Sequence, residues 1–200
     1  MKKALALAVL LSLTGIPKAS FADHLVPIAP KDSELIPTSN LEQAILVNAD
    51  LSIARLNEAN LREANLSHSY LFRTDLRNAN LVSANFERAV LLGTNLKGAN
   101  LEGANLRNTK LKDVNLKGAN LTRANLRDTQ LFRTDLKNAK LGNAKLNGAI
   151  LRGVKLDNSD LSGVDLSRAT LIRVTGKNLR SCPDFLPSMW VCEKNSLKQL

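Results

Sequence analysis

Few side chains in this sequence have the type and spacing needed for chemistry. His24 and His68 are the only histidines, and neither belongs to a cluster with the spacing of metal ligands. The chain contains no Gly-rich phosphate-binding loop, no serine nucleophile elbow and no HExxH motif. Carboxylates such as Asp75 and Asp135 recur in phase with a repeat, which is typical of a repeated surface position. We therefore expect a non-enzymatic protein that uses no metal and no cofactor.

The first 22 residues have the three parts of a secretory signal peptide. Two N-terminal lysines precede an apolar run over residues 4–16, and Ser20-Phe21-Ala22 forms a small-x-small cleavage site. The apolar run is too short to span a bilayer as an anchor. We predict cleavage after Ala22, in preference to a buried N-terminal helix or an uncleaved anchor. Removal of residues 1–22, which carry three lysines and no acidic residue, lowers the net charge from +10 to +7.

The elements that position the remaining side chains follow from a five-residue phrase, which recurs without insertion or deletion over residues 39–174. Its central residue is Leu at every step of five from Leu41 to Leu171, except at Phe86. This gives 27 consecutive repeats. A small residue, most often Ala, lies two positions before each centre, and Asn or Asp is commonest immediately before it.

A period of five is compatible with neither a regular helix nor a long strand. In a helix, a step of five turns by roughly 140° and spreads the leucines over all faces. In a strand, an odd step sends successive leucines to opposite faces. Both conflicts disappear when each phrase is a short strand-like edge followed by a corner. Ala59 and Leu61 then point inward, Asn60 and Arg62 point outward, and Glu63 lies at the corner.

A second period of twenty residues indicates that four edges complete one coil. The segments 71–76 and 131–136 are identical (LFRTDL) and lie three twenties apart. Residues that break the Asn or Asp preference also recur every twenty positions: Tyr70, Val90, Lys110, Gln130, Ile150 and Thr170. Twenty-seven phrases then form about seven coils, and stacking at the spacing of β-strands gives a rod about 32 Å long.

The phrase A-(N/D)-L-x-x resembles that of the pentapeptide-repeat proteins. It occurs in Ala99-Asn100-Leu101-Glu102-Gly103 and in Ala119-Asn120-Leu121-Thr122-Arg123, and the resemblance covers residues 39–174. It implies an all-β fold, a right-handed quadrilateral parallel β-helix. Some cyanobacterial members are exported and have similar Cys-bearing tails, so the expected compartment is the periplasm or the thylakoid lumen. Other members resemble DNA in shape and charge, and protect or inhibit DNA gyrase.

Both ends of the repeat array need a cover, because the end of a solenoid exposes unpaired backbone groups and an open apolar cross-section. Residues 23–38 are rich in aliphatic side chains and are predicted to form an N-terminal cap, in preference to a flexible tether. After Ile172 the phase fails, because Gly176 stands where the next Leu is due. Residues 175–200 are predicted to form a C-terminal cap.

Cys182 and Cys192 are the only cysteines and lie in this C-terminal segment. In an exported protein the pair should be oxidised to a disulfide. A disulfide between them would close the loop from Cys182 to Cys192 and stabilise the fold by about 2.8 kcal/mol through loop-closure entropy. The pair could sense redox conditions or act as a staple for the cap. Because the spacing is not C-x-x-C, we favour the staple.

Two sets of outward positions are candidate interaction surfaces. The first is an apolar column on one face, which would bind a protein partner unless the chain's own termini cover it. Its members are Tyr70, Phe72, Val90, Leu92, Phe132, Ile150 and Ile172. The second is a stripe of cations on the neighbouring face, which would attract anionic partners. Its members are Arg77, Lys97, Lys117 and Lys137. For the stripe we favour a merely solvated surface, because it lacks interleaved aromatic residues.

The leading hypothesis is an exported structural or protein-interaction module that binds an unidentified protein through the face of Phe72, Leu92 and Phe132. DNA mimicry with gyrase binding is the alternative, but mimicry needs a strongly negative cytoplasmic rod and this chain is basic with an export signal. A third possibility is an anionic ligand along the cationic stripe, whose binding should weaken with salt. Nucleic acid is not an expected partner, and no membrane span is expected after signal cleavage.

Overall fold

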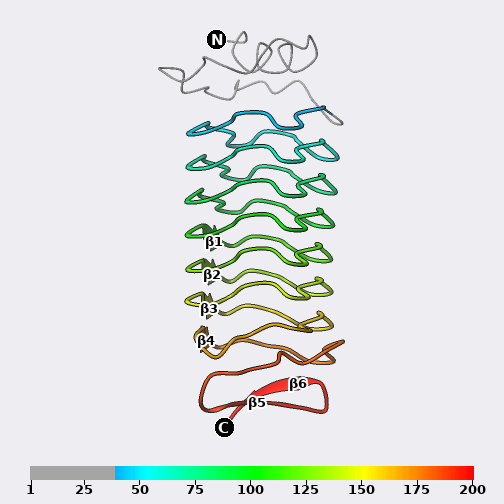
Figure 1. Cartoon of the computed structure of the whole chain (residues 1–200), viewed down its shortest axis with the longest axis vertical. Coiled ribbons are helices and arrows are strands. Elements are labelled where there is room, and N and C mark those ends of the chain that lie inside the picture. Colours follow the sequence, from blue (N-terminus) through cyan, green and yellow to red (C-terminus); the bar gives the residue numbers. More distant parts are fainter. Residues whose placement is uncertain (1–38) are drawn as a thin grey trace.

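The computed structural model describes residues 39–200, which form a straight rod of stacked coils (Figure 1). The predicted signal peptide (1–22), the predicted N-terminal cap (23–38) and His24 lie outside the described residues. Parallel bridges join residues twenty positions apart, as from Asn40 to Asn60 and from Asn60 to Asn80. Twenty residues therefore complete one coil, as the sequence period predicts. Residues 39–200 contain no helix, and hence none long and apolar enough to cross a membrane.

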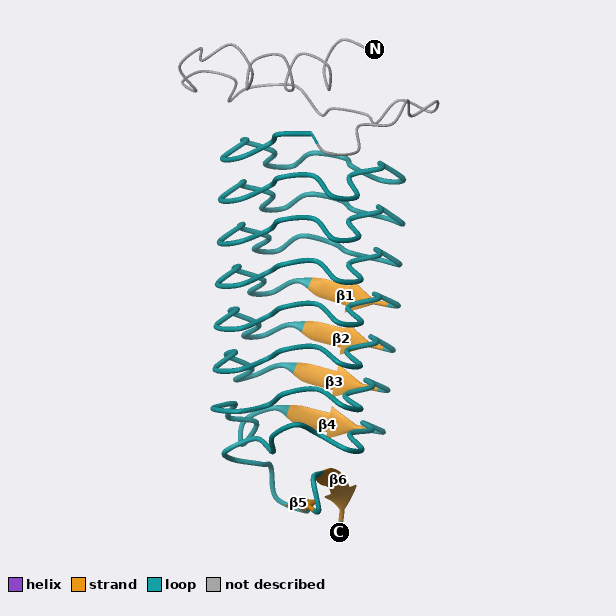
Figure 2. Ribbon diagram, turned by 90° about the vertical axis from the view of Figure 1, so that its right-hand side faces the viewer, coloured by secondary structure: helices purple, strands orange, loops and turns teal. Residues whose placement is uncertain are grey.

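Four three-residue strands lie one above another on one side of the rod (Figure 2). They are β1 (Lys110–Lys112), β2 (Gln130–Phe132), β3 (Ile150–Arg152) and β4 (Thr170–Ile172). The strands pair in parallel in the order β1-β2-β3-β4. Isolated bridges continue the same ladder toward the N-terminus through Val90, Tyr70 and Asp50. We call this side of the rod the ladder face. The fold is the all-β quadrilateral parallel β-helix expected from the sequence.

The core is a stack of leucines and small residues. Every repeat centre from Leu41 to Leu171 is buried, including Phe86. Each buried Leu stabilises the fold by roughly 1.5 to 3 kcal/mol before chain entropy is subtracted. Where the small residue carries a hydroxyl, that group is hydrogen-bonded, as when Thr134 Oγ1 donates to Leu111 O at 2.7 Å. Within residues 39–200, no buried side-chain nitrogen or oxygen lacks a hydrogen-bond partner.

The corner residue of nearly every repeat has a positive φ. Glu63 has a φ of 57°, and Ala64 N–H closes that turn on Leu61 O at 3.0 Å. Gly, Asn and Asp occupy many of these corners because they enter the left-handed region at low cost. Ile53, with a φ of 58°, is the β-branched exception. Burial of the leucines therefore overrides local backbone preference at such corners.

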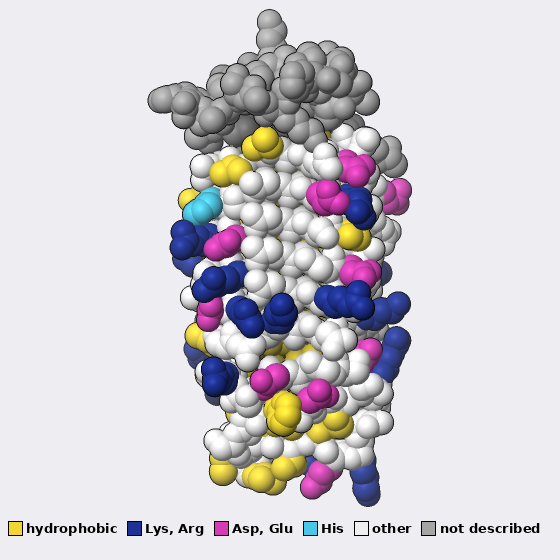
Figure 3. All heavy atoms as spheres, in the orientation of Figure 1, with side chains coloured by type: hydrophobic (Ala, Val, Ile, Leu, Met, Phe, Trp, Pro, Cys, Tyr) yellow, Lys and Arg dark blue, Asp and Glu magenta, His cyan; other side chains and the backbone are white. Residues whose placement is uncertain are grey.

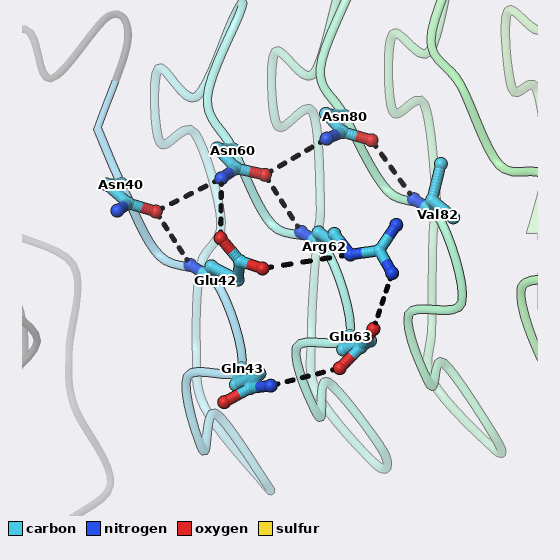
Figure 4. Close-up of polar contacts among 8 residues, drawn as sticks. All are labelled: Asn40, Glu42, Gln43, Asn60, Arg62, Glu63, Asn80 and Val82. Atoms are coloured by element: carbon cyan, nitrogen blue, oxygen red, sulfur yellow. Dashed lines mark hydrogen bonds and ion pairs between the residues drawn. The ribbon is translucent and has the colours of Figure 1, made fainter.

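Asparagines before the repeat centres hydrogen-bond from coil to coil. Asn60 Nδ2 donates to Asn40 Oδ1 at 3.2 Å, and Asn80 Nδ2 donates to Asn60 Oδ1 at 3.1 Å (Figure 4). Asn80 Oδ1 in turn accepts the backbone N–H of Val82 at 3.4 Å. One amide side chain thus bonds both to the turn of its own coil and to the neighbouring coil. This dual role explains the preference for Asn at this position.

The C-terminal segment ends in an antiparallel hairpin, β5 (Trp190–Glu193) and β6 (Ser196–Gln199). Before it, the bridge between Asp165 and Phe185 carries the parallel ladder beyond residue 174. Leu197 of β6 is buried beside Gly176, whose carbonyl accepts the Leu197 N–H at 2.8 Å. A Cβ placed on Gly176 would lie 2.9 Å from Leu197 Cδ1. Leu197 therefore fills the interior space beside Gly176, where the repeat lacks its Leu.

Candidate functional site: the ladder face

The apolar residues singled out in the sequence all lie on the ladder face, in two columns on either side of the buried leucines. The column before the leucines contains Tyr70, Val90, Lys110, Gln130, Ile150 and Thr170. The column after them contains Phe72, Leu92, Lys112, Phe132, Arg152 and Ile172. Because successive coils are spaced like paired strands, neighbours within a column lie about 4.8 Å apart along the rod.

The apolar side chains do not form one continuous strip. Tyr70 and Phe72 are 56% and 45% exposed, and half-buried Val90 and Leu92 lie one coil further on. We call these four residues the apolar patch. In the next coil, exposed Lys110 and Lys112 of β1 interrupt both columns. Beyond the lysines, polar or charged residues of the two columns separate the remaining apolar side chains. These apolar side chains are Phe132, Ile150 and Ile172.

Two corner residues extend the apolar patch and were missed from the sequence. The Arg73 guanidinium lies 5.1 Å from the centroid of the Phe72 ring, which is the geometry of a cation–π contact. Ile53 is 49% exposed and belongs to the coil before Phe72, whose carbonyl accepts the Ile53 N–H at 2.7 Å. The five-residue phrase identifies corner positions only as turns and gives no signal of which corner side chains lie beside the ladder columns.

The charges around the interruption are unbalanced. Arg133 forms a bidentate pair with Asp113, with Nε to Oδ1 and Nη2 to Oδ2 both at 2.7 Å. These hydrogen bonds lower the pKa of the Asp113 carboxyl, so it stays ionised and occupied by Arg133. Within residues 39–200, Lys110 and Lys112 form no ion pair of their own. The ladder face is therefore positive immediately after the apolar patch.

This positive region belongs to a larger basic belt over residues 107–155. The belt contains twelve Lys and Arg against three Asp, a net charge of +9. Residues 39–106 contain six Lys and Arg against seven Asp and Glu, a net charge of −1. Figure 3 shows Lys and Arg side chains gathered around mid-height on one view of the rod. The rod thus changes from nearly neutral to strongly basic between two adjacent stretches of coils.

Half of the charge of the predicted cationic stripe is neutralised by ion pairs. Arg77 binds Asp75 through Nε at 2.9 Å and Nη2 at 2.7 Å, and this hydrogen bonding lowers the pKa of the Asp75 carboxyl. Lys137 Nζ lies 3.3 Å from Asp157 Oδ2. Lys97 and Lys117 form no ion pair within the described part of the chain. The stripe is therefore a weaker anion site than its sequence indicates.

The cysteines lie in the C-terminal segment, and the remaining histidine lies at a corner of the rod. Cys182 and Cys192 are at disulfide distance, with their Cα atoms 6.1 Å apart, and they link the segment after the last coil to β5. That connection holds the hairpin that carries Leu197. His68 is exposed at a corner with a φ of 60°. In the described range, no group of three or more His, Cys, Asp and Glu could hold a metal ion.

Several solved structures are similar to this chain. The pentapeptide-repeat protein Rfr23 from the cyanobacterium Cyanothece 51142 is 45% identical over 46% of this chain and 63% of its own, with a TM-score of 0.44. The present chain thus spans less than two thirds of Rfr23. AT2G44920, a pentapeptide-repeat protein from the Arabidopsis thaliana thylakoid lumen, is 25% identical over 55% of this chain and 66% of its own, with a TM-score of 0.34.

QnrB1, a plasmid-mediated fluoroquinolone resistance protein, is 20% identical over 68% of this chain and 79% of its own, with a TM-score of 0.37. No curated protein matches the chain. The family described as pentapeptide repeats (8 copies) matches residues 39–71, 69–108, 99–138 and 134–173, which together exceed half of the sequence. On this match and on the fold, the chain belongs to the pentapeptide-repeat family, whose members form right-handed quadrilateral β-helices.

Proposed function

We propose that this protein is a non-enzymatic, exported protein-interaction module whose docking surface is the apolar patch of the ladder face. The observation that carries the proposal is the exposure of Tyr70 and Phe72, at 56% and 45%, on one coil of a hydrogen-bonded ladder, next to Val90 and Leu92 on the following coil. Contiguous exposed apolar side chains commonly mark interaction sites. Aromatic side chains are also enriched among the residues that dominate binding energy.

The rod is suited to present such a patch without reorganisation. The Tyr70 N–H donates to Ala49 O at 2.9 Å, and the Tyr70 carbonyl accepts the Leu51 N–H at 2.8 Å. The backbone beneath the patch is therefore bonded to its neighbouring coil on both sides of the residue. A preorganised surface binds with a smaller loss of conformational entropy than a loop does.

The location in the periplasm or the thylakoid lumen belongs to this proposal and is supported by the features of residues 1–22. Within a compartment of that kind, the proximity of Cys182 and Cys192 is in keeping with an oxidised pair. The alternative of DNA mimicry requires a strongly negative surface, whereas the belt over residues 107–155 has a net charge of +9. An anionic ligand on the cationic stripe would compete with Asp75 and Asp157 for half of its charges.

The test is affinity capture from the native host with the mature, oxidised protein. The double variant Phe72→Asp and Leu92→Asp should lose the proteins captured by the wild type, because two carboxylates would be buried against the partner's apolar surface. The control is Val82→Asp, which places one such carboxylate after a buried Leu on another face. Capture that survives the double variant, or that fails equally with Val82→Asp, contradicts the proposal. Thermal unfolding of all three proteins verifies that the rod is intact.

A further inference from the structure

We infer that the partner contacts the ladder face through a polypeptide segment in which apolar residues adjoin acidic ones, a proposal that rests on the docking function proposed above. The apolar part covers the apolar patch. The acidic part lies over Lys110 and Lys112, one coil further along. Both contacts come from the same two columns of the ladder, since Val90 bridges to Lys110.

The order of side chains along the ladder face carries this inference. Asp50 precedes the patch, and its Oδ1 already accepts the Ser52 N–H at 3.0 Å. The apolar patch follows, and then β1 presents two exposed lysines. The face therefore runs from acidic through apolar to basic within a few coils. A bound segment that reverses this order would bring like charges together and leave the lysines uncompensated.

The lysines are available to a partner because the nearby carboxylate is occupied. Asp113 follows Lys112 in the chain, but both of its oxygens are bonded to Arg133 at 2.7 Å. The next coils of the two columns add Gln130, Phe132 and Arg152, and no acidic residue. Carboxylates delivered by a partner would thus meet cations that have no competing acid in these columns.

The combination of apolar and basic surface also selects the kind of polymer. A nucleic-acid duplex or an acidic polysaccharide presents charge on every unit of its surface and would leave Tyr70 and Phe72 facing charged groups. A polypeptide can place leucine or phenylalanine beside glutamate within one short segment. Salt should weaken the acidic contact and leave the apolar contact nearly unchanged.

The experiment measures binding of a synthetic peptide, with a Leu- and Phe-containing half and a Glu-containing half, to the full mature chain by fluorescence anisotropy. The variant Lys110→Glu with Lys112→Glu should weaken binding by about tenfold or more, because attraction becomes repulsion at the two positions. The matched control, Lys97→Glu with Lys117→Glu, makes the same charge change on the neighbouring face and should change the Kd by less than about twofold. A peptide whose acidic half is replaced by Lys should not bind.

Four outcomes overturn the inference. The first is that the peptide with apolar and acidic halves does not bind, and the second is that both double Lys→Glu variants lose the same affinity for it. The third is that the Lys-containing peptide binds as tightly as the acidic one. The fourth is that polyglutamate binds as tightly as the peptide, which would indicate a general polyanion site. The two proposals can fail separately. If Phe72→Asp with Leu92→Asp abolishes host-protein capture while Lys110→Glu with Lys112→Glu leaves it unchanged, docking stands and the acidic segment is refuted. If both double variants capture normally, both proposals are refuted.

Discussion

The contact between Gly176 and Leu197 predicts that substitutions at the two positions are energetically coupled. Leu197→Ala removes three carbon atoms, at about 0.8 kcal/mol for each, and leaves a cavity. Because Leu197 is 9% exposed at the end of the rod, we expect a loss of about 2 to 3 kcal/mol in the free energy of unfolding, near the lower limit for Leu→Ala in a core. Trp190 lies in β5, packs against the core and is the only Trp, so its fluorescence reports on the C-terminal hairpin.

Gly176→Ala alone should destabilise the protein by about 1 to 3 kcal/mol, because the new Cβ would overpack a filled space. That Cβ would lie 2.9 Å from Leu197 Cδ1 and 3.1 Å from Leu197 Cγ, both closer than ordinary contact. Leu197→Ala removes both of these atoms, and the next nearest atom, Leu179 Cδ2, lies at the ordinary contact distance of 3.5 Å. In that background, Gly176→Ala should be neutral or stabilising by up to about 1 kcal/mol, through the lower entropy of the unfolded chain.

The assay is urea unfolding of the wild type, the two single variants and the double variant. The expected coupling energy is about 1 to 4 kcal/mol, in the sense that the double variant is more stable than the sum of the single losses. Gly142→Ala serves as the control, because Gly142 faces Ser162. This substitution should change the free energy of unfolding by the same amount in the wild type and in the Leu197→Ala variant. Strict additivity of Gly176→Ala and Leu197→Ala would refute the assignment of Leu197 to the space beside Gly176.

Three further predictions concern the cap, a corner and the acid limb of stability. Replacing Cys182 and Cys192 by Ser should lower the free energy of unfolding of the cap by about 2.8 kcal/mol, measured by Trp fluorescence in urea, and an unchanged midpoint would contradict the staple. Ile53→Asn should raise thermal stability by about 1 kcal/mol, because a β-branched residue at a φ of 58° is strained; a lower Tm would argue against strain there. The pKa of Asp75 is lowered chiefly by hydrogen bonding from Arg77. For Asp157, desolvation is the largest single effect and raises the pKa, but hydrogen bonds from the Lys177 N–H, Lys137 and Thr175 together with the charge of Lys137 outweigh it, so the pKa is lowered. Because the folded state holds these carboxyls ionised, their stabilising effect is full above the ordinary Asp pKa of 3.8 and is lost as the pH falls through the lower folded values. The test measures the urea midpoint at several pH values from 5 to 2. A midpoint that stays constant over this range would contradict the prediction.

The fold could be predicted from the sequence because its determinants repeat. A Leu at every fifth position allows only a coil with a corner in each phrase, and the period of twenty in residues such as Tyr70 and Lys110 gives the number of sides. The position of Leu197 could not be predicted in this way. It reaches the core by a hairpin that returns after Gly176, and a single non-repeated contact leaves no periodic signal.

The candidate site was predicted in position but not in extent. Phase alone places Phe72 and Phe132 on one face, and they do lie in one column of the ladder face. The separation of Phe72 from Phe132 by Lys112 follows from the same register. That Lys112 is exposed and makes the face positive there depends on the exposures and ion pairs of neighbouring side chains, which the register does not give. Pairing of Arg77 with Asp75 depends on side-chain conformation, which a repeat pattern does not specify.

The coil length also limits how the gene for such a rod can grow. A tandem duplication of twenty codons inserts one whole coil and returns every later side chain to its original face, since bridged residues are twenty apart. A duplication of five codons keeps every Leu inside but moves all later residues round by one side of the square. The core would survive such a change, while Lys110 and Lys112 would no longer follow Val90 and Leu92. Selection for folding alone therefore tolerates duplications of five codons. Selection that also keeps the residues of the ladder face together tolerates only duplications of twenty codons.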